Sequence, residues 1–402
     1  MTGVAQTLSM ADPGEELRAL RRARIAVTVA FAAHAVLSGF LGPWVPHLKE
    51  RTGLDAGGLG IALTGFAVGL LLGTRSAGPA VRRWGGRSVV RAGIPGMGIG
   101  FALLALAADL GSLTLIFLGI GLLAGLLDVS MNVEAVAVER RFGRRIMTAI
   151  HGTWSVALFV GAGLASAGIA AGMPIAIHLP LTSALVVAAS FALLRWLPAT
   201  EEERVGTPGA IVGSDLVHRR TSSEHLVLLL CVVAGASFLV EGIAVEWSAV
   251  FLRESVGAAT GAAGLGVVAF SAGMAGSRFV GDRLVSRFGQ STVVRAGAAC
   301  AFVALCVMLV VHRLAPSVVA FGIVGLGLGP VVPLAFRSAG WTDRPGHPNA
   351  LPIAATAGYV GSIIGPLLVG FIADAATLRL AFLVPVVACG FAIFAAGATR
   401  DR

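Results

Sequence analysis

Gly85-Gly86-Arg87-Ser88-Val89-Val90-Arg91-Ala92-Gly93 returns 204 residues later as Gly289-Gln290-Ser291-Thr292-Val293-Val294-Arg295-Ala296-Gly297. At the same spacing, Leu48-Lys49-Glu50 returns as Leu252-Arg253-Glu254. A repeat with a period of about half the chain is typical of proteins built from two similar halves. These duplicated stretches therefore predict two structural repeats that follow each other along the chain.

The composition indicates a membrane protein. Of the 402 residues, 56% are hydrophobic and only 13% are charged, which lies well outside the usage of soluble domains. Apolar runs of roughly 20 residues recur along the chain, and each is long enough to cross a bilayer as a helix. We identify twelve such spans by their hydropathy, at residues 24–43, 57–76, 89–108, 112–138, 146–171, 176–197, 225–250, 262–280, 292–312, 316–339, 350–373 and 378–398.

The basic residues predict how these spans are oriented. Arginine supplies 29 of the 30 basic residues. If the N-terminus is cytoplasmic, 25 basic residues fall on the cytoplasmic side and 5 on the other. Membrane proteins carry such an excess of positive charge in their cytoplasmic loops. We therefore expect both termini in the cytoplasm, and we interpret the net charge of +9 as an orientation signal and expect no nucleic-acid partner.

A polar, glycine-containing segment at 198–224 separates the two sets of six spans and predicts a flexible cytoplasmic linker. The expected fold is an all-α membrane protein with twelve transmembrane helices, in two six-helix bundles related by a pseudo-two-fold axis. The bundles occupy residues 24–197 and 225–398, with a cytoplasmic segment at 1–23 and a tail at 399–402. Such repeats place a substrate site at their interface, near the middle of the membrane.

The chain lacks the motifs of common soluble enzymes. Lys49 is the only lysine, so a Gly-Lys-(Ser/Thr) phosphate loop is absent, and neither Gly-x-Ser-x-Gly nor His-Glu-x-x-His occurs. The cysteines lie in apolar runs at unrelated spacings, which predicts neither disulfides nor a metal site; they are Cys231, Cys300, Cys306 and Cys389. We expect no enzymatic activity, no metal and no cofactor.

Several spans carry glycines four residues apart. Such ridges of small residues let helix backbones approach each other closely. They are Gly65/Gly69/Gly73, Gly121/Gly125, Gly325/Gly329 and Gly361/Gly365.

Taken together, the twelve spans, the duplicated loops and the long central loop resemble the major facilitator superfamily over essentially the whole chain. The loop motif of that family is Gly-x-x-x-Asp-(Arg/Lys)-x-Gly-(Arg/Lys). Both copies here lack its acid and carry Arg82 and Ser286 instead. The resemblance implies gating loops formed by Gly78, Arg82, Arg83, Gly85 and Arg87 in the first copy and by Asp282, Arg287 and Gly289 in the second.

Within the superfamily, Leu127-Asp128-x-x-x-Asn132 is similar to the Leu-Glu-x-x-x-Asn of fucose-permease-like proton symporters, in which the acid couples transport to protons. His151-Gly152-Thr153-Trp154-Ser155 and residues 357–366 resemble a related group of bacterial inner-membrane permeases. The first-helix acid of the permease aligns near Gly42 and is missing here. Span 112–138 has no arginine, and helix 5 has no Gly-Pro, which weighs against a drug–proton antiporter.

Asp128 is the leading candidate for proton coupling. A carboxylate deep in a membrane helix costs ~2.5–3.5 kcal/mol on insertion scales, so it normally faces a cavity or a partner. Asn132 follows one turn later on the same face and is a candidate for substrate binding. The alternative is a structural acid paired with a neighbouring helix. Glu134, about 240° around the helix, is a second proton-coupling candidate that we expect near helix 2 or a cytoplasmic arginine.

Four further residues complete the candidate site. Glu241 lies in span 7, the symmetry mate of span 1, and is a third proton-coupling candidate. His34, at the midpoint of span 1, is able to titrate near neutral pH or bind a ligand, unless a neighbouring carbonyl satisfies it. His151 and Trp154 are candidates for substrate binding; the tryptophan suits either a sugar face or a membrane interface.

Other charged residues have simpler interpretations. Glu246 is expected near the outer interface, beside the aromatic Trp247. Arg75, Arg278 and Arg337 end their predicted spans, where arginine side chains reach from the membrane to water. We assign none of these residues to the site.

The sequence thus predicts a monomeric secondary transporter that works by alternating access in a bacterial inner membrane. We expect proton-coupled uptake of a small polar solute, sugar-like or another metabolite, so that the partners are the solute, protons and the lipid bilayer. One alternative is proton-coupled efflux through Glu241 or Glu134. Another is a receptor or scaffold that transports nothing, against which the short loops weigh.

Overall fold

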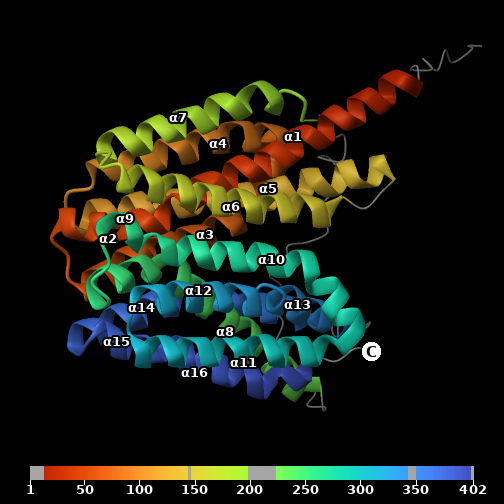
Figure 1. The fold of residues 1–402 in the computed structure, drawn as a ribbon. Coiled ribbons are helices and arrows are strands. Elements are labelled where there is room, and N and C mark those ends of the chain that lie inside the picture. Colours follow the sequence, from red (N-terminus) through yellow and green to blue (C-terminus); the bar gives the residue numbers. More distant parts are fainter. Residues whose placement is uncertain (1–12, 144–145, 198–222, 343–349, 400–402) are drawn as a thin grey trace, which may run out of the picture.

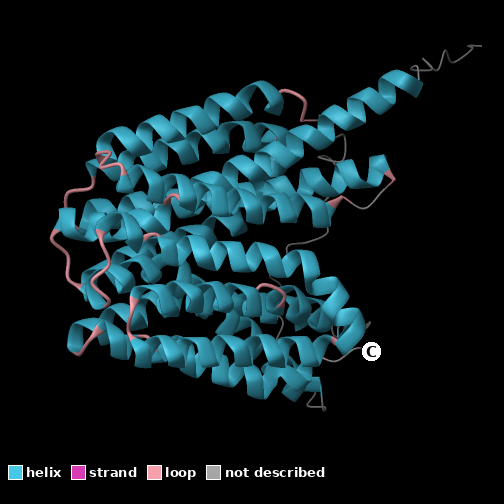
Figure 2. Cartoon of the chain, viewed as in Figure 1, coloured by secondary structure: helices cyan, strands magenta, loops and turns pink. Residues whose placement is uncertain are grey.

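In a computed structural model of the protein, residues 13–143, 146–197, 223–342 and 350–399 are described, and helices dominate them (Figure 2). Twelve helical spans in this part of the chain are long and apolar enough to cross a membrane. The predicted all-α membrane fold with twelve spans is therefore confirmed. The predicted linker at 198–224 lies almost wholly outside the described residues, and the bundle boundaries remain predictions.

The helices before residue 198 form the upper part of the molecule in Figure 1. They are α1 (Pro13–Gly39), α2 (Leu41–Thr52), α3 (Ala56–Trp84), α4 (Gly86–Leu103), η1 (Leu104–Leu106), α5 (Leu110–Phe142), α6 (Met147–Ala170) and α7 (Ile175–Leu194).

Most helices after residue 222 form the lower part in the same view. They are α8 (Ser223–Val250), η3 (Phe251–Ser255), α9 (Thr260–Ala263), α10 (Leu265–Phe288), α11 (Gln290–Val311), α12 (Leu314–Leu328), α13 (Val331–Thr342), α14 (Ala350–Ala375), α15 (Leu378–Ala381), α16 (Leu383–Ala395) and η4 (Ala396–Ala398). We call the two groups the N-terminal and C-terminal halves.

The first span is longer than hydropathy predicted. The prediction ended at residue 43, but the helical path continues through α2 to Thr52. Phe40 keeps a helical backbone between α1 and α2 (φ −68°, ψ −25°), and α2 then buries Trp44 and Leu48. Gly53, with a φ of 65°, ends it. As a result, Lys49 lies on a helix and not in a loop.

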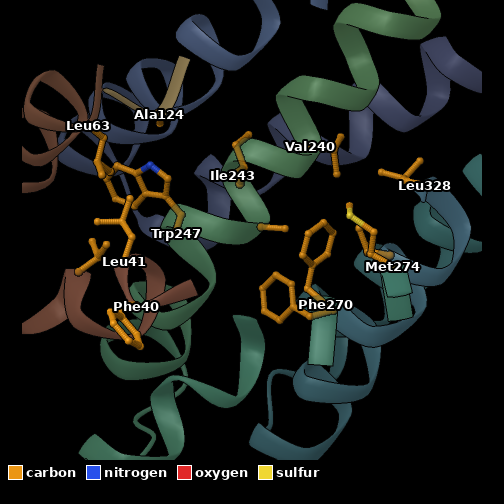
Figure 3. Close-up of a cluster of buried hydrophobic side chains, with 14 of the residues drawn as sticks. Phe40, Leu41, Leu63, Ala124, Val240, Ile243, Trp247, Phe270, Met274 and Leu328 are labelled. Carbon is orange, nitrogen blue, oxygen red and sulfur yellow. The ribbon is translucent and has the colours of Figure 1, made fainter. Parts of the chain in front are cut away.

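One continuous apolar core joins the two halves. Its largest fully buried side chains include Trp44 from α2 and Trp247 from α8. Figure 3 shows the Trp247 indole beside Leu41 and Leu63, which belong to the N-terminal half. The halves therefore pack tightly at the level of these residues.

Glycine brings the backbones of α3 and α5 into contact. A Cβ atom on Gly121 would overlap the carbonyl oxygen of Phe66, and one on Gly125 would overlap that of Leu70. The C-terminal half repeats this seam 204 residues later, where a Cβ on Gly325 of α12 would overlap the Phe270 carbonyl of α10. The predicted glycine ridges at these positions are confirmed as sites of close helix packing.

The duplicated stretch that opens at Gly85 and Gly289 is a duplicated turn. These glycines end α3 and α10 with φ angles of 81° and 78°, a region that L-residues with a Cβ atom rarely adopt. The residues before them also match, because Arg83 lies over the Trp84 ring and Arg287 over the Phe288 ring. We call this end of the molecule the arginine-rich face.

Two ion pairs join the halves at the opposite end, which we call the Lys49 face. Lys49 Nζ lies 2.6 Å from a carboxylate oxygen of Glu254, and Arg253 Nε lies 3.5 Å from Glu50 Oε1. The duplicated Leu-(Lys/Arg)-Glu segments thus pair with each other, the base of each copy with the acid of the other. The contact obeys the pseudo-two-fold relation of the repeat.

The glycine seam yields a stability prediction. Gly121→Ala places a methyl group against the Phe66 carbonyl and should lower the free energy of unfolding by about 1–3 kcal/mol, the usual cost of overpacking. Gly119→Ala, on the same helix, is the control, because a Cβ there meets nothing within 4 Å. Thermal unfolding of the purified protein in detergent compares the two. Equal thermal unfolding midpoints for Gly121→Ala and Gly119→Ala would show that α3 and α5 are not closely packed at Gly121.

The paired charges on the Lys49 face yield a conformational prediction. Partly exposed ion pairs contribute up to about 1 kcal/mol each, so Lys49→Glu should shift the population of separated halves by about fivefold or more. Adding Glu254→Lys should restore the original distribution. Spin labels at the exposed residues Ala108 and Ala259, with the native cysteines replaced, report the distance between the halves. If the double variant Lys49→Glu with Glu254→Lys kept the altered distance distribution of Lys49→Glu, the pairing of Lys49 with Glu254 would be contradicted.

Candidate functional site

His34 links three helices of the N-terminal half. Its side chain, on α1, is only 6% exposed, and its Nδ1 accepts a hydrogen bond from Trp154 Nε1 of α6 at 3.1 Å. Nε2 of the same ring is buried and has no hydrogen-bond partner among the described residues, and the ring also interacts with the Ala124 backbone of α5. Because Nδ1 acts as an acceptor, the neutral ring carries its proton on Nε2. His34 and Trp154, both predicted from the sequence, therefore form one unit.

Asp128 and Asn132 lie one turn apart on α5, as their spacing predicts. Asn132 Nδ2 donates to the Asp128 carbonyl oxygen at 2.8 Å and lies 3.3 Å from Asp128 Oδ1. Both side chains remain partly exposed. Asp128 interacts electrostatically with Tyr359 on α14, which belongs to the C-terminal half. The leading candidate acid therefore faces the interface between the halves.

Glu241 and Arg278 form the charged part of the site in the C-terminal half. The two side chains, on α8 and α10, interact as opposite charges. Arg278 Nη1 also donates to Ser155 Oγ at 2.6 Å, and its guanidinium lies 5.7 Å from the centre of the Trp154 ring. His151 on α6 also interacts with the positive charge of Arg278. Arg278 thus reaches across the interface to the helix that carries two predicted site residues.

The sequence analysis left Arg278 out of the site. The predicted span ended at residue 280, so this arginine was interpreted as a residue that reaches out to water. In the structure α10 continues to Phe288, eight residues beyond the predicted end, and Arg278 therefore lies well inside the helix. The repeat indicates where this helix ends. The equivalent helix, α3, ends at Trp84, and Trp84 corresponds to Phe288, the last residue of α10.

Two polar contacts across the interface are equivalent under the repeat. The Thr74 side chain on α3 interacts with Tyr359 on α14, and Arg278 on α10 donates a hydrogen bond to Ser155 on α6. Adding 204 to the number of Thr74 gives Arg278, and adding it to Ser155 gives Tyr359. The backbone positions are duplicated while the side chains differ, so sequence similarity alone did not reveal this pair.

At three equivalent positions of the site the two halves carry different types of side chain. Three polar positions of the N-terminal half, His34, Asn132 and Ser155, correspond 204 residues later to Phe238, Phe336 and Tyr359. The centre of the Phe238 ring lies 5.9 Å from that of Tyr359 and 6.1 Å from that of Phe336. The two halves therefore present different chemistry to each other.

Glu134 does not belong to this cluster. Its side chain is 1% exposed, and a Cβ on Gly86 would overlap its Oε1. Gly86 is the first residue of α4, where the partial positive charge of a helix N-terminus stabilises a carboxylate. The structure places its carboxylate at the start of α4, just beyond the end of α3, the second span. The two acids of α5 thus occupy different sites.

Glu246 differs from its predicted environment. It is 6% exposed instead of lying at an open interface, and Oε2 is buried with no hydrogen-bond partner among the described residues. The adjacent Trp247 is fully buried. A buried acid in a membrane helix is a functional candidate by default. The burial of Glu246 could not be predicted from the sequence, because it depends on how α8 packs against both halves.

The candidate gating residues lie at the arginine-rich face, at the ends of α3 and α10. The side chain of Asp282 lies outside the part that the structure describes. The gating role of these residues remains a prediction. Among the described histidines, cysteines and acids, no group of three or more is placed to hold a metal ion.

The charges of Glu241 and Arg278 yield a stability prediction. Arg278→Gln removes the hydrogen bond to Ser155 and the positive charge that acts on Glu241, and it should lower the free energy of unfolding by about 1–3 kcal/mol. Glu241→Gln in the same chain should recover the part of that loss that comes from the unmatched acid. Arg283→Gln, at an exposed arginine of the same helix, serves as the control. Chemical unfolding in detergent measures the cycle; a double variant no more stable than Arg278→Gln would refute the pairing.

Known proteins resemble the chain in sequence. The family model of the Major Facilitator Superfamily matches residues 27–336 and 229–401. An uncharacterized MFS-type transporter of Yersinia pestis is 32% identical over 85% of this chain and 86% of its own length. An uncharacterized transporter of Sinorhizobium fredii is 29% identical over 89% of this chain and 93% of its own length.

Solved structures share the fold. The nucleoside transporter NupG superposes with a TM-score of 0.68 at 11% identity, over 94% of this chain and 98% of that one. The human organic anion transporter TETRAN superposes with a TM-score of 0.65 at 15% identity, over 95% and 99%. At these identities the two structures show only that the chain shares their fold. The family-model match and the Yersinia relative, together with the twelve spans, show that the chain is a membrane transporter of the major facilitator superfamily.

Proposed function

We propose that the protein is a secondary active transporter that carries a small polar solute together with protons by alternating access. The main support is the position of Asp128 and Asn132, which face Tyr359 across the interface of the two halves. A substrate site between two repeats is the arrangement expected for this mechanism. Because the proposed site lies between the two halves of a single chain, we propose that the monomer is the transporting unit.

Asp128 is the proposed proton carrier because protonation changes the cost of closing the halves around it. An ionised carboxylate that loses contact with water is costly, whereas a protonated one is much less so. Glu241, in contrast, already has Arg278 as its counter-charge. This difference favours Asp128 over Glu241 as the group that exchanges protons. Glu134, at the start of α4, is proposed to act structurally.

The solute is proposed to combine hydrogen-bonding groups with an apolar ring face. Asn132 supplies hydrogen-bonding atoms in the N-terminal half, and Phe238, Phe336 and Tyr359 supply aromatic surface in the other. Aromatic rings pack well against ring-shaped solutes. His34 uses Nδ1 to hold Trp154, so we assign His34 and Trp154 the role of shaping the site and leave only Nε2 for a ligand.

We propose that the arginine-rich face lies in the cytoplasm of a bacterial cell, since loops rich in arginine stay on that side of the inner membrane. In that orientation the ion pairs of Lys49 and Arg253 close the outer side. Export would use the same machinery with the opposite direction of coupling. Everted and right-side-out vesicles distinguish the two directions.

The proposal predicts the behaviour of Asp128→Asn in proteoliposomes. Accumulation of solute driven by a proton gradient should be lost, because the amide cannot exchange a proton. Exchange of labelled for unlabelled solute should persist, because that reaction needs no net proton movement. The solute is first selected from a metabolite panel by thermal shift at two pH values.

Asp374→Asn is the matched control, since this aspartate lies near the Lys49 face, close to Gly57. It should accumulate solute like the wild-type protein. Undiminished gradient-driven accumulation by Asp128→Asn would remove Asp128 from the mechanism.

A further inference from the structure

A cavity of about 670 Å³ lies beside α1 and α5 near the arginine-rich end of the N-terminal half. Arg21 and Arg24 of α1 line one part of it, and Ile25, Thr28, Val29, Phe142 and Ile146 line the rest. It is separate from the candidate site, because it includes none of the residues assigned there. Its lining combines two positive charges with an otherwise largely apolar surface.

The two guanidinium groups are available to an external anion. Arg21 and Arg24 are both exposed, and within the described ranges neither pairs with a carboxylate. Arg24 lies over the Phe142 ring, 5.6 Å from its centre, which fixes the guanidinium at the edge of the cavity. The nearby Thr28 hydroxyl is occupied, because it donates to the Arg24 carbonyl at 2.9 Å.

The apolar part of the cavity is open to the surroundings of the helix bundle. Ile25 is 47% exposed, and the membrane span that contains it begins at Leu17. The arginines and the apolar side chains therefore lie near the end of a membrane-crossing helix, at the level where phospholipid headgroups meet hydrocarbon. A free phosphate would use only the arginines, whereas a phospholipid would use both parts.

We propose that this cavity binds an anionic phospholipid. The phosphate accepts hydrogen bonds from Arg21 and Arg24, for which guanidinium groups are well suited, and an acyl chain lies along Ile25 and Val29. Basic pockets between transmembrane helices are known to hold such headgroups. A lipid bound here touches both α1 and α5, the helices that carry His34 and Asp128, and holds their ends together.

Native mass spectrometry of the full-length protein in detergent tests the proposal with three probes: phosphatidylglycerol, phosphatidylcholine and glycerol 3-phosphate. Wild-type protein should retain phosphatidylglycerol in preference to phosphatidylcholine. The double change Arg21→Gln with Arg24→Gln should weaken retention about 30-fold, since each basic group near an anionic lipid contributes roughly fivefold. Arg22→Gln is the control, because Arg22 lies over Trp196 instead.

A second variant separates lipid from simple phosphate binding. Val29→Trp fills the apolar part of the cavity and leaves both arginines in place, so it should release phosphatidylglycerol as well. Three results would overturn the proposal: equal retention of the two lipids by the wild type, equal loss in Arg22→Gln and the double variant, or full retention in Val29→Trp. Competition by glycerol 3-phosphate at lipid concentrations would likewise identify a phosphate site instead of a lipid site.

Discussion

A charge inside a bilayer is costly unless it finds a partner or a polar environment, and this constraint accounts for the positions of three acids of the transmembrane helices, Asp128, Glu134 and Glu241. Asp128 lies beside an asparagine and faces a tyrosine of the other half. Glu241 interacts with the positive charge of Arg278. The Glu134 carboxylate lies against Gly86, the first residue of α4. The charged groups thus gather between helices. The polar interface between the halves follows from this sorting.

The repeat then determines how the halves touch. The ion pairs of Lys49 and Arg253 are equivalent under it, and so are the polar contacts of Thr74 with Tyr359 and of Ser155 with Arg278. Each contact contributes little, because the charged side chains of the Lys49–Glu254 pair are 14% and 36% exposed and partly screened. These weak, symmetric polar contacts supplement the apolar core that joins the halves around Trp44 and Trp247. The glycine seams within each half, in contrast, keep each bundle rigid.

Much of the fold was predictable from the sequence, because hydropathy and the spacing of 204 residues report directly on spans and repeats. The duplicated turns at Gly85 and Gly289 also followed, since their conformation requires glycine. The site was only partly predictable. Asp128 and Asn132 were found from spacing along one helix. Arg278 and Glu246 were not, because their environments depend on helices far away in the sequence.

The difference between the halves was equally hidden. His34 and Phe238 occupy equivalent positions, but only the three-dimensional contacts show that one belongs to a polar cluster and the other to an aromatic one. Duplication conserved the backbone while the side chains diverged, so the repeat predicts architecture better than chemistry. This divergence is what makes a symmetric scaffold able to bind an asymmetric solute.

The central claim is that Asp128 carries a proton with the solute, and proton movement measures it most directly. In a lightly buffered suspension of cells that express the protein, adding the transported solute should raise the external pH, because protons enter with it. Cells that express Asp128→Asn should show no such change. An accumulated solute that leaves the external pH unchanged, or an equal rise with Asp128→Asn, would contradict the account.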